Sequence, residues 1–136
     1  MEVPAGHGEW ILVVDDEETI REITTAALEH AGYRVLTACD GTEAVARYAH
    51  YKDRISLVIA DMVMPFLDGA ALIQALKRMQ PAVKILAMSG RTEDGSIERL
   101  IEKKEIHFVA KPFSSRALLA EVNKLLAGSA VLSKKA

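Results

Sequence analysis

Short apolar runs alternate along this chain with longer segments in which apolar residues recur every three or four positions. The short runs have the length of strands and end at polar or turn-forming residues, which is typical of strands buried on both faces of a sheet. The longer segments carry the apolar stripe of amphipathic helices. The pattern predicts strands over residues 10–14, 33–38, 55–60, 83–88 and 106–110, and helices over residues 17–31, 41–49, 70–79, 91–104 and 114–127.

The first and last predicted helices have the clearest core faces. Gly32 is placed to terminate the first helix, and Ser114-Ser115 is placed to begin the last one. The predicted core residues are Ile20, Ile23, Ala27, Leu28 and Ala31 in the first helix, and Leu118, Leu119, Val122, Leu125 and Leu126 in the last. The helix over residues 91–104 has a thinner apolar stripe, so we expect it to be marginal.

Strands that alternate with helices predict an α/β domain with one parallel sheet. Parallel strands need crossover connections, and these place helices on both faces of the sheet. The Pro- and Gly-containing residues 1–9 are predicted to be a linker or flexible arm, residues 10–127 the domain, and residues 128–136 a tail that follows Gly128.

Composition narrows the class of protein. The chain has 136 residues, of which 50% are hydrophobic and 26% charged, with a formal net charge of -2, so neither disorder nor a general affinity for nucleic acid is expected. A single cysteine, Cys39, excludes an internal disulfide and fits a reducing compartment. Apolar runs of membrane-spanning length and a signal peptide are both missing from the sequence, so we predict a cytoplasmic location and no membrane contact by the domain itself.

Polar residues whose side chains could bind a ligand or take part in a reaction follow four of the predicted strands. They are Asp15 and Asp16, Asp61, Ser89, and Lys111 followed by Pro112. Ligands bind at the carboxyl ends of the strands in open parallel sheets, so these side chains are expected to converge if their strands are neighbours. Each has an ordinary alternative: either aspartate could cap the helix after it, Ser89 could cap a turn, and Lys111 could be solvated.

A cluster of carboxylates is harder to explain by these alternatives. Carboxylates a few ångströms apart repel one another unless a cation lies among them, and an all-oxygen site with few protein ligands suits Mg²⁺. A carboxylate can also act as a nucleophile and form an aspartyl-phosphate. Asp61 stands alone after a central strand and is the candidate nucleophile, while Asp15 and Asp16 are placed to hold the metal.

These motifs together resemble the receiver domain of bacterial two-component response regulators. The resemblance covers about residues 9–127 and rests on Asp15-Asp16, on Asp61 with Met64-Pro65 and Asp68-Gly69, on Ser89, and on Lys111-Pro112-Phe113. It implies a flavodoxin-like, doubly wound fold with five parallel strands in the order 2-1-3-4-5 and five helices. It also implies a phosphoacceptor signalling domain, with no enzyme activity beyond its own phosphorylation and dephosphorylation.

The resemblance also implies roles for individual residues. Asp61 would accept a phosphoryl group from the phosphohistidine of a histidine kinase or a histidine phosphotransfer domain. Mg²⁺, or Mn²⁺ in its place, would be bound by Asp15, Asp16, Asp61 and the backbone carbonyl of Val63. Lys111 would pair with the phosphoryl group next to a possible cis bond to Pro112. Ser89 and Phe108 would form the switch that couples the site to the face of the fourth helix, fifth strand and fifth helix.

Two departures from the family pattern concern the switch and the phosphoryl lifetime. Phe108 stands where many relatives have tyrosine, so a switch there must work through packing. The apolar Val63 cannot hydrogen-bond an attacking water through its side chain, whereas Arg91 could lean over the phosphoryl group. We therefore expect a fairly long-lived phosphoryl group.

Other functions remain as alternatives. A Mg²⁺-dependent phosphohydrolase could use Asp61 as nucleophile, but Val63 stands where such enzymes usually carry a general acid. A flavodoxin-like cofactor binder would need a phosphate loop where Asp15 and Asp16 would repel phosphate. The receiver itself could be a stand-alone regulator or the C-terminal receiver of a hybrid sensor histidine kinase, whose membrane kinase would then tether it. In either case the output partner is unknown.

Overall fold

Strands and helices alternate along the chain as the apolar pattern predicts. In the computed structural model, residues 8–61, 69–89, 107–110 and 114–135 are described. The elements, in chain order, are β1 (Trp10–Val14), α1 (Glu18–His30), β2 (Arg34–Ala38), α2 (Gly41–Tyr51), β3 (Ile55–Asp61), α3 (Gly69–Met79), β4 (Ile85–Ser89), β5 (His107–Ala110) and α5 (Ser115–Lys135). The helix predicted over residues 91–104 lies outside the described residues.

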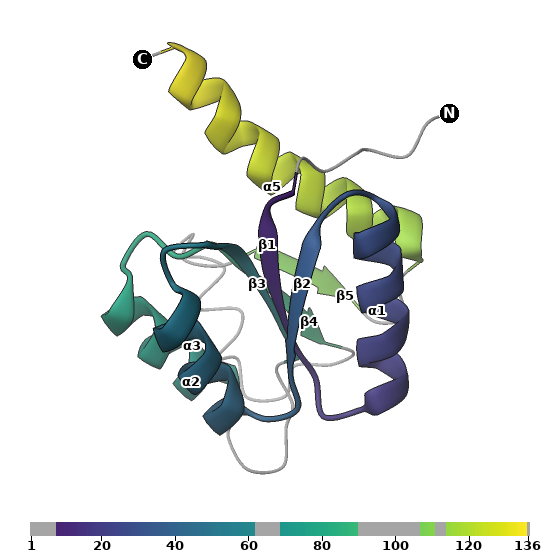
Figure 1. Ribbon diagram of the computed structural model, residues 1–136, viewed down its shortest axis with the longest axis vertical. Helices are drawn as coiled ribbons and strands as arrows, with labels where there is room; N and C mark the ends of the chain where they lie inside the picture. The colour runs from purple at the N-terminus through teal and green to yellow at the C-terminus, as the bar shows by residue number, and fades with distance from the viewer. Residues whose placement is uncertain (1–7, 62–68, 90–106, 111–113, 136) are drawn as a thin grey trace.

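The strands form one parallel sheet in the order β2-β1-β3-β4-β5. Helices α2 and α3 cover one face of this sheet, and α1 and α5 cover the other (Figure 1). The predicted α/β class and the order of the first four strands are confirmed. The carboxyl ends of neighbouring parallel strands meet at one edge, so the residues after β1 lie near the last residues of β3 and β4.

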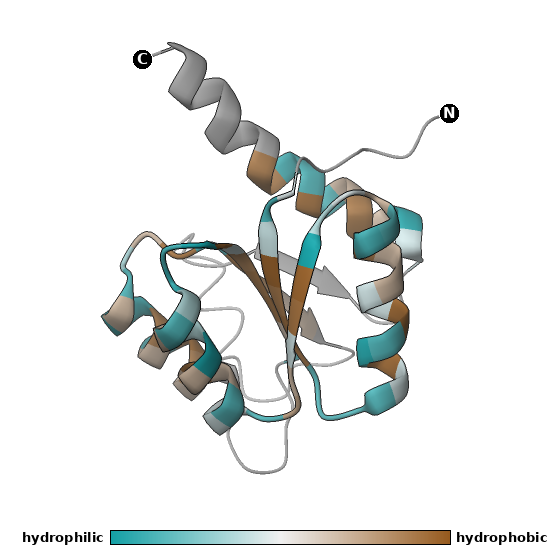
Figure 2. Ribbon diagram, viewed as in Figure 1, coloured by the Kyte–Doolittle hydropathy of each residue, from teal (hydrophilic) through white to brown (hydrophobic). Residues whose placement is uncertain are grey.

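Alternation along the central strands divides the core into two halves. Leu12 and Val14 of β1 face the α2 and α3 side, whereas Ile11 and Val13 belong to the cluster on the α1 and α5 side. All four are fully buried, and β1, β2 and β3 are largely apolar in Figure 2, while the turns after β1 and β2 are hydrophilic. Because a parallel sheet covered on both faces excludes water from both, its central strands need apolar residues at consecutive positions.

Helix α1 ends as predicted, but its core face differs from the prediction. Gly32 has φ +101°, the N–H of Tyr33 donates to the Leu28 carbonyl at 3.0 Å, and the N–H of Gly32 donates to the Glu29 carbonyl at 3.1 Å. This Schellman arrangement needs a glycine in the left-handed region. The assignment of Ile23 to the core was wrong: Ile23 is 55% exposed, and Thr24 is buried with Leu28 and Ala31. The buried face of α1 therefore includes Thr24 in place of the neighbouring aliphatic residue Ile23.

The last helix is longer than predicted. Its predicted core residues are buried, but α5 continues through Gly128 to Lys135, so the predicted helix end before Gly128 was wrong. An interior glycine costs a helix only about 1 kcal/mol relative to alanine, so it need not terminate a segment whose other residues favour helix. Figure 1 shows the end of α5 extending beyond the sheet.

Gly8 and Glu9, at the end of the predicted arm, are hydrogen-bonded to the segment that leads into β2. The Gly8 N–H donates to the Gly32 carbonyl at 2.8 Å, and the Glu9 carbonyl accepts from the Arg34 N–H at 2.9 Å. These bonds tie the last two residues of the predicted arm to the beginning of β2. Among the residues that the structure describes, no helix is both long enough and apolar enough to cross a membrane.

Candidate functional site

The pairing of β1 with β3 brings two aspartates side by side. Ile11 pairs with Leu57 and Val13 with Ile59, and all four belong to the cluster on the α1 and α5 side. Asp15 and Asp61 each lie two residues beyond the last of these pairs. Because side chains alternate with a period of two, both carboxylates continue the same row, on adjacent strands and on the same side of the sheet.

Asp15 is held by three hydrogen bonds. Its N–H donates to the Ala38 carbonyl at 3.1 Å, which extends the contact between β1 and β2. Its Oδ1 accepts from the Glu17 N–H at 2.9 Å, and its carbonyl accepts from Arg21 Nη1 at 2.7 Å. The alternative in which an aspartate caps α1 is not what the structure has, because Glu17 occupies the N-cap position and no side chain caps it. Asp15 is fully buried; two of these bonds hold its backbone, and the bond from the Glu17 N–H orients its carboxylate.

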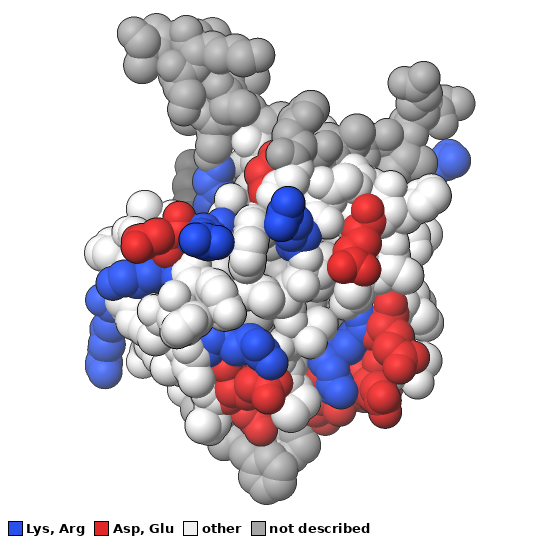
Figure 3. All heavy atoms as spheres, viewed as in Figure 1, with Lys and Arg blue, Asp and Glu red and all other residues white. Residues whose placement is uncertain are grey.

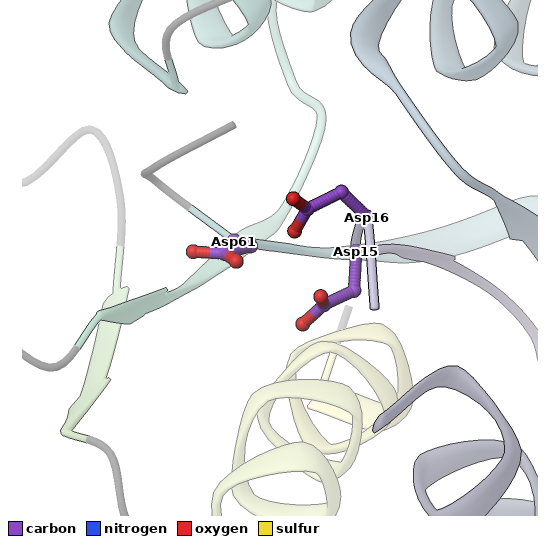
Figure 4. Close-up of side chains that lie close together, drawn as sticks. All are labelled: Asp15, Asp16 and Asp61. Carbon is purple, nitrogen blue, oxygen red and sulfur yellow. The ribbon is translucent and has the colours of Figure 1, made fainter. Parts of the chain in front are cut away.

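The side chains of Asp15, Asp16 and Asp61 converge (Figure 4). Each offers an oxygen atom, and these atoms all lie within 4.8 Å of one another. Asp61 is 5% exposed and Asp16 is exposed, so the cluster has two buried members and one that faces solvent. Three carboxylates at this spacing repel one another, and a divalent cation would reverse the sign of that interaction.

The donor set fits a hard divalent cation. All three donors are carboxylate oxygens, which Mg²⁺, Ca²⁺ and Mn²⁺ prefer over nitrogen or sulfur. Two oxygens bound to one Mg²⁺ lie at most about 4.2 Å apart, since each is about 2.1 Å from the ion. The observed spacing of up to 4.8 Å is close to that limit, so small side-chain rotations would suffice.

The other predicted site residues are only partly placed. Ser89 is the last residue of β4, and Phe108 is the second residue of β5. Val63, Arg91, Lys111 and Pro112 lie outside the described residues. The roles of these six residues therefore stay predictions.

Sequence reasoning missed Arg21. This arginine is six residues beyond Asp15, on the second turn of α1, and its guanidinium reaches back to the Asp15 carbonyl. A basic residue that follows a helix start by less than two turns is a weak signal, because solvated arginines are common at such positions.

Cys39 is an exposed free cysteine that directly follows β2. The carboxylate of Glu43 accepts from its N–H at 2.8 Å, and Asp40 caps α2 by accepting from the Glu43 N–H at 2.8 Å. Desolvation, together with the nearby Glu43 and Asp40 carboxylates, raises the pKa of the exposed Cys39 thiol. A raised pKa favours the thiol over the more nucleophilic thiolate.

An acidic cluster at the carboxyl edge of a parallel α/β sheet is typical of the pocket of phosphoacceptor signalling domains. The family model described as "Response regulator receiver domain" matches residues 11–123, and the chain belongs to this family. Receiver domains are phosphoacceptor modules of two-component signalling rather than true enzymes, and they partner with histidine kinases.

Individual relatives agree with this assignment. The chain is 33% identical over 116 residues to the sensor kinase CckA of Brucella abortus, which covers 85% of this chain and 12% of that protein. It is 34% identical over 121 residues to the alkaline phosphatase synthesis transcriptional regulatory protein PhoP of Bacillus subtilis, covering 89% and 50% of the two chains. A receiver domain structure from Clostridium thermocellum is similar with a TM-score of 0.80 and 28% identity, covering 91% and 98%. The chain thus spans half or less of the two curated relatives.

Proposed function

We propose that Asp61 is the phosphoacceptor of this receiver domain. The observation that carries the proposal is the register of β1 and β3, which brings Asp61 beside Asp15 and within 4.8 Å of the Asp15 and Asp16 oxygens. A nearly buried carboxylate beside a metal-binding pair is suited to in-line attack on phosphorus, because the metal site and the nucleophile share one fixed frame.

The donor in this proposal is the phosphohistidine of a histidine kinase or a histidine phosphotransfer domain. One Asp61 oxygen attacks phosphorus, an O–P bond forms, and the P–N bond to the donor imidazole breaks. The imidazole leaves with the electron pair of that bond and takes up a proton. The product is an acyl phosphate on Asp61, with no net hydrolysis.

Asp15, Asp16 and the Asp61 carboxylate are the proposed ligands of Mg²⁺, with Mn²⁺ as a substitute and the Val63 carbonyl as a further ligand. A bound divalent ion would offset negative charge on the transferring oxygens. Burial of Asp15 and its three hydrogen bonds keep one ligand oriented before any ion binds. Lys111 is proposed to pair with the phosphoryl oxygens.

Ser89 and Phe108 are the proposed switch. Ser89 ends β4 and pairs with Ala110 of β5, while Phe108 pairs with Ala87 of β4. A change at Ser89 therefore has a direct backbone connection to β5, which supports signalling through the face that includes β5 and α5. The output partner would recognise that face.

The phosphoryl group is proposed to be long-lived because Val63 is apolar. The Val63→Asn variant places an amide that can orient an attacking water, so the half-life of the phosphorylated protein should shorten. The half-life is measured by the decay of intact mass after the phosphodonor is removed, with Arg91→Ala as a second variant of the same site. An unchanged half-life in Val63→Asn would contradict the role of Val63.

The deciding experiment is phosphorylation by a small phosphodonor, followed by intact mass. Wild type and Asp53→Asn should each gain one phosphoryl group when Mg²⁺ is present, because Asp53 lies in the exposed turn before β3. Asp61→Asn should gain none. Continuous phosphate release would favour the hydrolase, and modification of Asp61→Asn would refute the assignment of the acceptor.

The place of this domain in a longer protein is also a proposal. Residues 10–127 are proposed as the receiver, at a cytoplasmic location, either alone or as the C-terminal part of a hybrid kinase. Both a sensor kinase, CckA, and a transcriptional regulatory protein, PhoP, are among the relatives, so the similarities are consistent with a receiver in either kind of protein.

A further inference from the structure

One hydrogen bond ties α1 to the peptide bond between Asp15 and Asp16, the two proposed metal ligands that follow β1. Arg21 Nη1 donates to the Asp15 carbonyl at 2.7 Å, and this contact is partly buried. That carbonyl belongs to the peptide unit that joins Asp15 to Asp16. Because a peptide unit is planar, holding its oxygen restricts rotation on both sides, about ψ of Asp15 and φ of Asp16.

Asp16 needs such a restraint more than the other two aspartates do. Asp61 is the last residue of β3 and pairs with Met88 of β4, and Asp15 bonds to Ala38 beyond the end of β2. Asp16 follows β1 without a place in the sheet, and it is exposed. If the peptide plane before it rotated, its carboxylate would swing away from the other two.

Arg21 is well placed to hold that plane. Its own N–H donates to the Glu17 carbonyl at 3.0 Å, so its backbone is fixed within α1. It lines a groove with Glu18, Glu22 and Thr37, between α1 and the edge strand β2. Figure 3 shows basic side chains among acidic ones over this side of the molecule.

We propose that Arg21 is a positioning residue that orients the Asp15–Asp16 peptide so that both carboxylates can bind one divalent ion. The proposal rests on the function proposed for this site. A charged donor makes a stronger bond to a carbonyl than a neutral donor does, and groups that orient metal ligands typically change metal affinity by 10- to 100-fold when they are removed.

The test compares Mg²⁺ affinity and phosphorylation in Arg21→Met, Arg21→Lys and Arg54→Met. Methionine keeps the helix propensity and the apolar stem but donates no hydrogen bond. Arg54 is the matched control, because its guanidinium lies 5.6 Å from the Trp10 ring at the opposite end of β1. Calorimetry gives the Mg²⁺ dissociation constant of the unphosphorylated proteins, and melting temperature in chelator reports whether each variant is folded.

The Mg²⁺ dissociation constant of Arg21→Met should rise by about tenfold, within the range seen when a ligand-orienting group is lost. Its phosphorylation rate should fall at limiting Mg²⁺ and return close to the wild-type rate at saturating Mg²⁺. Arg21→Lys, which keeps a charged donor, should recover most of the affinity. Arg54→Met should match wild type.

The proposal is overturned if Arg21→Met binds Mg²⁺ as wild type does, or if its rate stays equally low at saturating Mg²⁺. Should Arg21→Met not fold, Arg21→Gln removes the charge, and a wild-type dissociation constant in that variant also overturns the proposal. Failure of the proposed function looks different: wild type and Arg54→Met would then bind no Mg²⁺ and accept no phosphoryl group.

Discussion

Removing the exposed member of the acidic cluster should stabilise the metal-free domain. In the Asp16→Asn variant, two repulsive pairs are lost, each between oxygens that lie within 4.8 Å. At that distance one pair costs roughly 0.9 kcal/mol in water and roughly 3.5 kcal/mol at an effective dielectric constant of about 20. Because Asp16 is exposed, the lower value applies, and the free energy of unfolding should rise by about 1 to 2 kcal/mol.

The same variant should lose the stabilisation that metal gives. For 136 residues the unfolding entropy is about 0.29 kcal/mol/K, so the metal-free gain corresponds to roughly 3 to 7 °C in melting temperature. Mg²⁺ at about 100 times its dissociation constant should stabilise wild type by about 2.7 kcal/mol, or roughly 9 °C. The order of the two melting temperatures should therefore reverse: Asp16→Asn should have the higher melting temperature in chelator, and wild type should have the higher one in Mg²⁺.

Thermal unfolding followed by far-ultraviolet circular dichroism measures both differences. Asp53→Asn is the control, since it makes the same change of charge in an exposed turn that precedes β3. Two results would refute the reasoning. In one, Asp16→Asn melts at or below wild type in chelator; in the other, Mg²⁺ raises both melting temperatures equally.

Three further predictions concern the scaffold. Gly32→Ala should lower the melting temperature by roughly 3 to 7 °C, because φ +101° costs an L-residue about 1 to 2 kcal/mol, and an unchanged value in a thermal melt would exclude that strain. Asp40→Ala removes the cap that accepts from the Glu43 N–H and should cost about 1 kcal/mol in urea unfolding, a loss that Asp40→Asn should largely avoid. Burial raises the pKa of Tyr48, so the unfolded chain releases this proton first, and the free energy of unfolding should fall as pH rises above 10. Urea unfolding of Tyr48→Phe should show a smaller fall over the same pH range. An identical fall would contradict the prediction.

Much of the fold could be predicted because its signals are local. The apolar runs at Trp10–Val14 and in β3, and the glycine after α1, each have a short-range physical cause that the sequence displays. The face that α1 buries could not be predicted from side-chain type, because Ile23 and Thr24 differ by one step around the helix and tertiary packing decides between them. The end of α5 was predicted too early because a glycine weakens a helix without necessarily ending it.

The site was predictable in its residue types and less so in its geometry. Asp15 and Asp16 follow β1, Asp61 ends β3, and the sheet order brings the three together, as expected. The sequence could not show that hydrogen bonds hold both the backbone and the carboxylate of Asp15, or that one of the backbone bonds comes from Arg21. Such bonds depend on how the loop after β1 turns, which is a three-dimensional property with no periodic signal.

The register of β1 against β3 makes the site sensitive to length as well as to residue type. Asp61 lies four residues beyond Leu57, and Asp15 lies four residues beyond Ile11, which pairs with Leu57. Deleting one residue within either interval would exchange the faces of the residues beyond the deletion, so that a core side chain and a carboxylate would trade sides. An insertion in an exposed turn, such as the one around Asp53, leaves these intervals unchanged. The two strands therefore tolerate conservative substitutions better than they tolerate a single-residue insertion or deletion.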